Sequence, residues 1–67
     1  MPGTVTSPVE VVQLTPQGVW IAYHDQEYFL DHDLFPWFKD ATVKEVFNVQ
    51  EVSPEHLYWP DIDVDLD

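Results

Sequence analysis

The chain has 67 residues and no cysteine, and 13 acidic residues stand against two lysines, which gives a formal net charge of −11 at pH 7. Without cysteine it has neither disulfide bonds nor thiolate zinc sites. Nucleic acids and anionic membrane surfaces attract basic proteins, so the charge argues against both as partners and favours a basic protein. The alternative is that the charge serves only to keep a small protein soluble.

The N-terminus has no basic segment followed by an apolar stretch, so we expect no signal peptide. No run of residues approaches the roughly 18 apolar residues of a membrane span. The sequence therefore predicts a cytoplasmic protein that does not enter a membrane.

The first half of the chain predicts an antiparallel meander. Two prolines and a glycine make residues 1–8 a flexible lead-in to a single domain over residues 9–67. Apolar alternation and turn residues then predict three strands, at residues 9–15, 19–24 and 27–31. Turns are expected at residues 16–18 and 25–26, where Gly18 is free to take a positive φ. Short turns between sequential strands give antiparallel neighbours.

A short helical segment follows the meander. Asp33 is suited to be the N-cap of a short helix with Pro36 in its first turn. Asp40 or Thr42 would begin a second helical turn that runs through Phe47. The large rings of this region are expected to pack onto the sheet.

A closing strand pair completes the predicted fold. Residues 48–52 and 56–59 predict two strands, and Pro60 ends the second because proline cannot donate to a strand ladder. The sequence thus predicts an α+β fold: a small, mainly antiparallel sheet of four or five strands, made of the meander and the closing pair, with one short helical segment on one face.

The last seven residues, 61–67, alternate aspartate with an apolar residue. In an extended conformation the carboxylates would lie on one face, and Ile62, Val64 and Leu66 on the other. Two interpretations remain open. The segment packs back on its own sheet, or its edge accepts a strand from a partner or from a second copy.

Charge and the alternating tail together predict a docking surface for a basic partner. Its candidate residues are Trp37, Trp59, Asp61, Asp63 and Asp65. Trp37 belongs to the set because an exposed tryptophan is a typical hot spot of an interface.

Chemistry beyond binding finds little support in the sequence. His24, His32 and His56 lie near carboxylates, but their spacing matches no metal motif, so they are interpreted as turn histidines and no metal or cofactor is expected. The hydroxyl residues lack a glycine-flanked elbow, and the two glycines form no phosphate loop, so no catalytic residue is assigned. A small divalent-metal- or ligand-binding protein that uses carboxylate and histidine groups is the alternative from another class, and a structural homodimer without a ligand is a third.

Several stretches carry a family resemblance: Gly-Val-Trp at 18–20, Tyr-Phe-Leu at 28–30, Phe-Pro-Trp-Phe-Lys-Asp-Ala at 35–41 and residues 56–66. The most specific is the Trp-Pro-Asp-x-Asp segment at 59–63. Together they resemble the short bacterial proteins of the domain-of-unknown-function 2442 family. The resemblance implies a compact α+β domain without known enzymatic activity. It also implies an antitoxin-like binding role by analogy, because some members are encoded beside another small protein in arrangements that look like toxin–antitoxin pairs.

Overall fold

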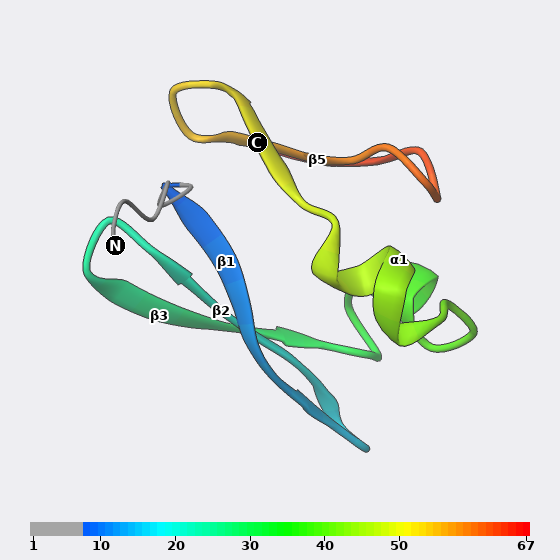
Figure 1. The fold of residues 1–67 in the computed structure, drawn as a ribbon. Helices are drawn as coiled ribbons and strands as arrows, with labels where there is room; N and C mark the ends of the chain where they lie inside the picture. Colours follow the sequence, from blue (N-terminus) through cyan, green and yellow to red (C-terminus); the bar gives the residue numbers. More distant parts are fainter. Residues whose placement is uncertain (1–7) are drawn as a thin grey trace, which may run out of the picture.

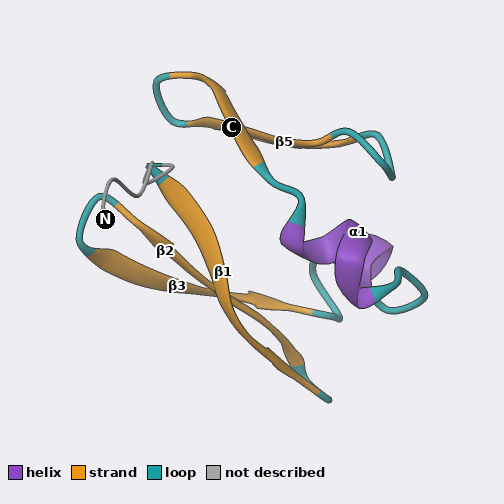
Figure 2. Cartoon of the chain, in the orientation of Figure 1, coloured by secondary structure: helices purple, strands orange, loops and turns teal. Residues whose placement is uncertain are grey.

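The computed structural model describes residues 8–67, which form two antiparallel three-stranded sheets, one short helix and one 3-10 helix (Figures 1 and 2). The predicted α+β class is confirmed. The strands divide between two sheets, however, and do not form one sheet of four or five strands. Apart from residue 8, the predicted lead-in lies outside the described residues.

The N-terminal sheet is the predicted meander, with strand order β1-β2-β3. Its strands are β1 (Val9–Thr15), β2 (Gly18–Tyr23) and β3 (Gln26–Asp31). His24 and Asp25 connect β2 to β3 with φ values of 51° and 65°. Positive φ at both central residues is the signature of a type I′ hairpin turn, which twists as the strands do. The turn therefore lies one residue earlier than predicted.

Between the sheets the chain forms the 3-10 helix η1 (Pro36–Phe38) and the helix α1 (Val43–Phe47). Thr42 is the N-cap of α1: its hydroxyl accepts from the Glu45 N–H at 3.1 Å, and the Glu45 carboxylate accepts from the Thr42 N–H at 2.9 Å. This reciprocal capping box settles the predicted choice between Asp40 and Thr42.

The prediction that Asp33 caps a helix is wrong. Its backbone N–H donates to the Asp31 carboxylate at 2.7 Å, in a turn that ends β3. The 3-10 helix begins further on, and its N-cap is Phe35, which makes no side-chain capping bond. Asp33 thus belongs to the turn and lies too early in the chain to cap η1.

The C-terminal sheet has strand order β4-β5-β6. Its strands are β4 (Gln50–Ser53), β5 (His56–Trp59) and β6 (Val64–Leu66). Short turns join them, so each pairs with its neighbour in sequence and none pairs with the meander. Pro60 follows β5 directly, as predicted.

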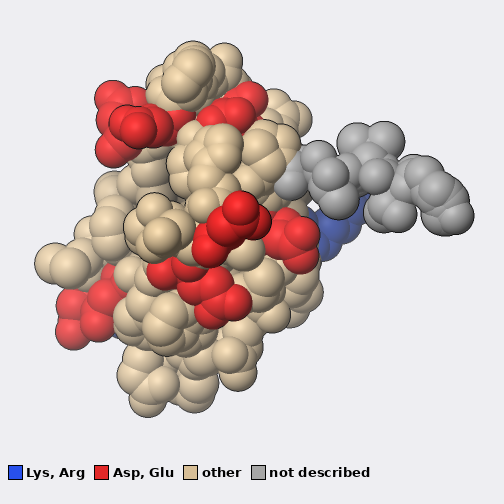
Figure 3. All heavy atoms as spheres, turned by 90° about the vertical axis from the view of Figure 1, so that its left-hand side faces the viewer, with Lys and Arg blue, Asp and Glu red and all other residues tan. Residues whose placement is uncertain are grey.

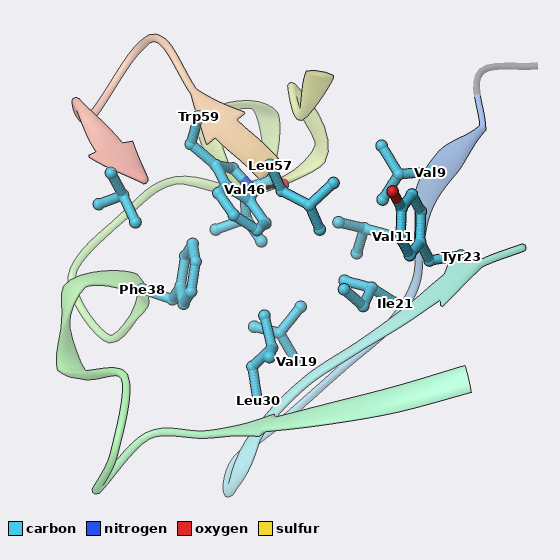
Figure 4. Close-up of a cluster of buried hydrophobic side chains, with 11 residues drawn as sticks. Val9, Val11, Val19, Ile21, Tyr23, Leu30, Phe38, Val46, Leu57 and Trp59 are labelled. Carbon is cyan, nitrogen blue, oxygen red and sulfur yellow. Dashed lines mark hydrogen bonds between the residues drawn. The ribbon is translucent and has the colours of Figure 1, made fainter. Parts of the chain in front are cut away.

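The hydrophobic core lies between the two sheets (Figure 4). The N-terminal sheet directs Val9, Val11, Val19, Ile21, Tyr23 and Leu30 into it; the C-terminal sheet and the helical segment supply Leu57, Trp59, Val64, Phe38 and Val46. Of the two faces of β2, the one that carries Val19, Ile21 and Tyr23 is therefore the buried one.

Trp59 lies at the centre of this core, with 0% of its surface exposed. Its ring meets Phe38 edge-on at a centroid distance of 4.9 Å, and its Nε1–H donates to the Val46 carbonyl at 2.9 Å. Its prediction as a docking residue is wrong, because Trp59 shares the inward face of β5 with Leu57.

Candidate functional site

The acidic tail is not a continuous strand. Residues 60–63 form a turn, and β6 comprises only Val64–Leu66. Trp59 pairs with Val64, so the chain reverses within these four residues, with Asp63 in the left-handed region at φ 55°. Asp61 and Asp63 therefore belong to a turn, and of the three predicted aspartates Asp65 alone lies on a strand.

Three of the four carboxylates of the tail make hydrogen bonds within the domain. The hydrogen bonds are Asn48 Nδ2 to Asp61 Oδ2 at 3.0 Å, Tyr58 Oη to Asp63 Oδ1 at 3.1 Å, and His56 Nε2 with Asp65 Oδ1 at 3.1 Å. The bond to Asp63 raises the pKa of the Tyr58 phenol above its ordinary value. These contacts join the turn and β6 to β5 and to Asn48, the C-cap of α1.

The five predicted docking residues do not form one surface. Trp37 lies on η1 with 50% of its surface exposed, and its nearest ring neighbour is Phe35 at a centroid distance of 6.1 Å. Trp59 is in the core, and the aspartates belong to the β5–β6 turn and β6. Trp37 is exposed, as a docking residue must be, but it does not share a surface with Trp59.

Within residues 8–67, no cluster of three or more histidine and carboxylate side chains is arranged to hold a metal ion. The nearest approach is at His56, whose Nε2 lies 3.1 Å from Asp65 Oδ1 and whose Nδ1 lies 3.5 Å from Asp67 Oδ1. The two carboxylates occupy opposite ring nitrogens, so they do not converge on one point.

A polar network that the sequence analysis did not identify joins the two sheets. The Tyr23 hydroxyl, at the end of β2, donates to the Glu51 carboxylate on β4 and accepts from the Glu55 N–H at 2.8 Å. His24 Nε2 lies 3.6 Å from the same Glu51 oxygen. No local pattern predicts this network, because its members are about 30 residues apart; the inward position of Tyr23 was its only signal.

The network shifts the pKa values of its two central groups in opposite directions. The hydrogen bond to Glu51 and burial raise the pKa of the Tyr23 phenol above its ordinary value of 10.0. The hydrogen bond from Tyr23 is the main cause that lowers the pKa of the Glu51 carboxyl below its ordinary value of 4.5. Both shifts favour the pair with a neutral phenol and an ionised carboxylate.

The substitution Tyr23→Phe tests the network through pH. Glu51, with its lowered pKa, contributes stability that is complete above 4.5 and is lost as the pH falls through its folded-state pKa. Tyr23, with its raised pKa, contributes stability that is complete below 10.0 and is lost as the pH rises through its folded-state pKa. We expect the melting temperature of the variant to be lower than that of the wild type, by a difference that is largest between these limits and shrinks on both sides.

Taking the difference between two proteins cancels the effect of the other carboxylates, which titrate in both. Tyr28→Phe is the matched control because it removes a hydroxyl from an exposed tyrosine of the same sheet. If the difference in melting temperature between the wild type and Tyr23→Phe did not change with pH, the assigned hydrogen bond would be contradicted.

An apolar groove of about 370 Å³ opens between the two sheets. Ile21 and Leu30 line it from the N-terminal sheet, and Leu57 and Leu66 line it from the C-terminal sheet. Its volume lies near the lower end of the range for small-ligand pockets. We refer to this space as the intersheet groove.

Two edge strands flank the intersheet groove. Tyr28 of β3 and Leu66 of β6 both line it, and each of these strands is the last of its sheet. Tyr28 keeps 46% of its surface exposed, and the exposed carboxylates of Glu55 and Asp67 also belong to the lining. The groove is thus apolar inside and acidic where it meets solvent.

The acidic residues lie at the surface. All 13 belong to the described part of the chain, in which no charged residue is buried. Figure 3 shows the side on which the β2–β3 and β4–β5 turns lie: acidic side chains form several separate groups across it, and lysine is visible only at one edge. The ion pairs within residues 8–67 all use histidine, so Lys39 and Lys44 pair with none of the carboxylates.

Comparison with known proteins gives one match, to the family described as "protein of unknown function (DUF2442)", over residues 8–67. Neither a curated protein nor a solved structure matches the chain. In the part of the chain that the structure describes, no helix has the length and apolar character needed to cross a membrane.

Proposed function

From the premise that the chain belongs to the DUF2442 family, whose function is unknown, we propose that it is a non-enzymatic protein-interaction module that binds a basic protein partner. The observation that carries this proposal is the uncompensated charge. Thirteen carboxylates lie at the surface of a 67-residue chain, and neither lysine neutralises any of them within residues 8–67. A field of one sign accelerates encounter with a partner of the opposite sign and repels copies of the same chain.

The structure supports a change in the proposed docking surface. The aspartates of the β5–β6 turn already accept hydrogen bonds inside the domain, so they are weaker candidates for recognition. The intersheet groove is the better candidate because it offers apolar area beside the carboxylates of Glu55 and Asp67. Interfaces commonly combine an apolar centre with a charged rim in this way.

The cellular role that fits this binding is antitoxin-like: the module would neutralise a small basic protein encoded beside it. The support is the resemblance to family members in such gene pairs, together with the acidic surface. Under this proposal, binding alone is the function, and the chain performs no chemistry on its partner.

The experiment is to purify the chain and the product of the adjacent gene separately and to measure their affinity by calorimetry at two salt concentrations. We expect a complex at about 50 mM salt and at least tenfold weaker binding at about 500 mM, because salt screens the charges that attract the partners. An unrelated basic protein of similar size is the control for non-specific attraction. Co-expression should also relieve any growth inhibition that the neighbour causes alone.

Two results would overturn the proposal. The first is the absence of a complex at low salt, which would show that the charge attracts no dedicated partner. The second is a complex whose affinity does not depend on salt, because the acidic surface would then play no part in it.

A further inference from the structure

We propose that the partner binds as an extended segment that pairs with the free edge of β3, with basic and apolar residues alternating along it. Its apolar side chains enter the intersheet groove, and its basic side chains meet the carboxylates at the edge of the N-terminal sheet. This inference rests on the proposed function and names the surface and the chemistry of the partner.

The edge of β3 has backbone groups available for such pairing. Within residues 8–67, β3 pairs on one side only, with β2. In an antiparallel pair every second residue turns its N–H and C=O away from its neighbour strand. Tyr23 and Gln26 close the two-residue turn, so the residues that face outward are Glu27 and Phe29.

The side chains of β3 alternate across this edge. Tyr28 and Leu30 point into the intersheet groove, whereas Glu27 and Phe29 lie on the other face of the sheet. A strand added beside β3 continues the pleat, so its side chains also alternate between the two faces. Those on the groove side would lie next to Tyr28 and Leu30 and would bury apolar area.

The charges around the edge of β3 determine which residues of the partner segment fit on the outer face of the sheet. Glu27 is exposed on the outer face of β3, and Asp25 and Asp31 lie at the two ends of the strand. Glu55 and Asp67 add negative charge at the groove. Cross-strand pairs of opposite charge are favourable and pairs of like charge are not, so lysine or arginine fits the outward positions.

The same charges disfavour a second copy of the chain as the occupant. Two β3 strands side by side would bring their Glu27 and Asp31 carboxylates together across the new pair. The other edges are less suited to an added strand: β1 has a register irregularity between Val11 and Gln13, β4 has four residues with an irregularity between Glu51 and Ser53, and β6 has only three residues. The six regular residues of β3 give the best template for a basic partner strand.

The test is selection of random octapeptides, displayed on phage, against the full chain at low salt. We expect the enriched peptides to place lysine or arginine and apolar residues at alternating positions. A synthetic peptide of the best sequence should slow hydrogen exchange at the backbone amides of Glu27 and Phe29, because those amides gain partners.

Three substitutions separate pairing from charge. Glu27→Pro removes the outward N–H, and edge strands accept proline where its nitrogen faces solvent; we expect at least tenfold weaker peptide binding. Glu27→Gln keeps the N–H and removes the charge, so it should weaken binding less, by about threefold. Glu10→Gln removes the same charge from the outer face of β1 and should leave the affinity within twofold. Circular dichroism confirms that each variant is folded.

The outcomes distinguish this inference from the proposed function. Enriched peptides that are basic but lack alternation, or whose affinity is unchanged by Glu27→Pro in a folded variant, would overturn the pairing with β3 and leave the proposal of a basic partner standing. Enrichment of peptides without basic residues would overturn both. Alternating peptides that need the Glu27 N–H would support both.

Discussion

Trp59→Ala is expected to remove about half or more of the free energy of unfolding of the chain at 25 °C. Trp59 is fully buried between the sheets, and it contacts the Phe38 ring and donates to the Val46 carbonyl. Truncating a buried tryptophan to alanine costs about 3–5 kcal/mol. At about 0.1 kcal/mol per residue, a domain of this size has a free energy of unfolding of about 7 kcal/mol, so about 2–4 kcal/mol would remain.

Urea unfolding followed by far-UV circular dichroism measures this effect. Trp59→Phe separates the ring from its N–H: it keeps an aromatic side chain and leaves the Val46 carbonyl without its donor, which costs about 1–3 kcal/mol. Trp37→Ala is the matched control, because this tryptophan is half exposed and its loss should change stability by less than about 1 kcal/mol. A Trp59→Ala variant as stable as the control would mean that Trp59 is not the centre of the core.

The alternation of apolar and polar residues predicts the strands better than it predicts which face of each strand is buried. The alternation in β2 predicts a strand, and the structure shows which of its faces is buried: Val19, Ile21 and Tyr23 point into the core. In β5 the same rule was inconclusive: Tyr58 and Trp59 are adjacent aromatics, and either face could have been the inner one. Leu57, two residues before Trp59, was the available signal for the correct face.

The acidic tail shows where a period of two misleads. Alternating aspartates predict an extended strand, but pairing Trp59 with Val64 requires a turn over residues 60–63. Aspartate tolerates the left-handed φ that Asp63 adopts, so the residue that suggested an acidic ladder also suits a turn. Which of the two forms depends on the buried position of Trp59, and that is a tertiary constraint.

The intersheet groove could not be predicted for a related reason. Its lining comes from both sheets, and the sequence was interpreted as one sheet. Tyr28 and Leu30 are predicted on a strand, but the face they share lines a groove only because β6 lies opposite it. Likewise, the bond between Tyr23 and Glu51 exists only because two separate sheets face each other.

Gly18→Ala is the second substitution for which we expect a large effect, a loss of about 1–3 kcal/mol, the usual cost of overpacking. The turn sequence predicts a positive φ at Gly18, but the φ of Gly18 is not positive. The structural reason is close approach: a Cβ at this position would lie 2.3 Å from the Leu30 carbonyl oxygen and 2.7 Å from Phe29 Cζ. The Phe29 ring can rotate, whereas the carbonyl belongs to the backbone of β3 and moves only if β3 separates from β2.

The double variant Gly18→Ala/Phe29→Ala tests whether the Leu30 carbonyl or the Phe29 ring causes the loss of stability. If the carbonyl is responsible, removing the ring recovers none of the stability that Gly18→Ala loses in urea unfolding; full recovery would assign the clash to Phe29 instead. The first result has a consequence for binding, since the displaced strand is the one whose edge presents Glu27 and Phe29. Gly18→Ala should then lower the affinity for a peptide of alternating basic and apolar residues, even under conditions where the variant is fully folded. The reason is that the β3 edge and the intersheet groove no longer keep their relative positions.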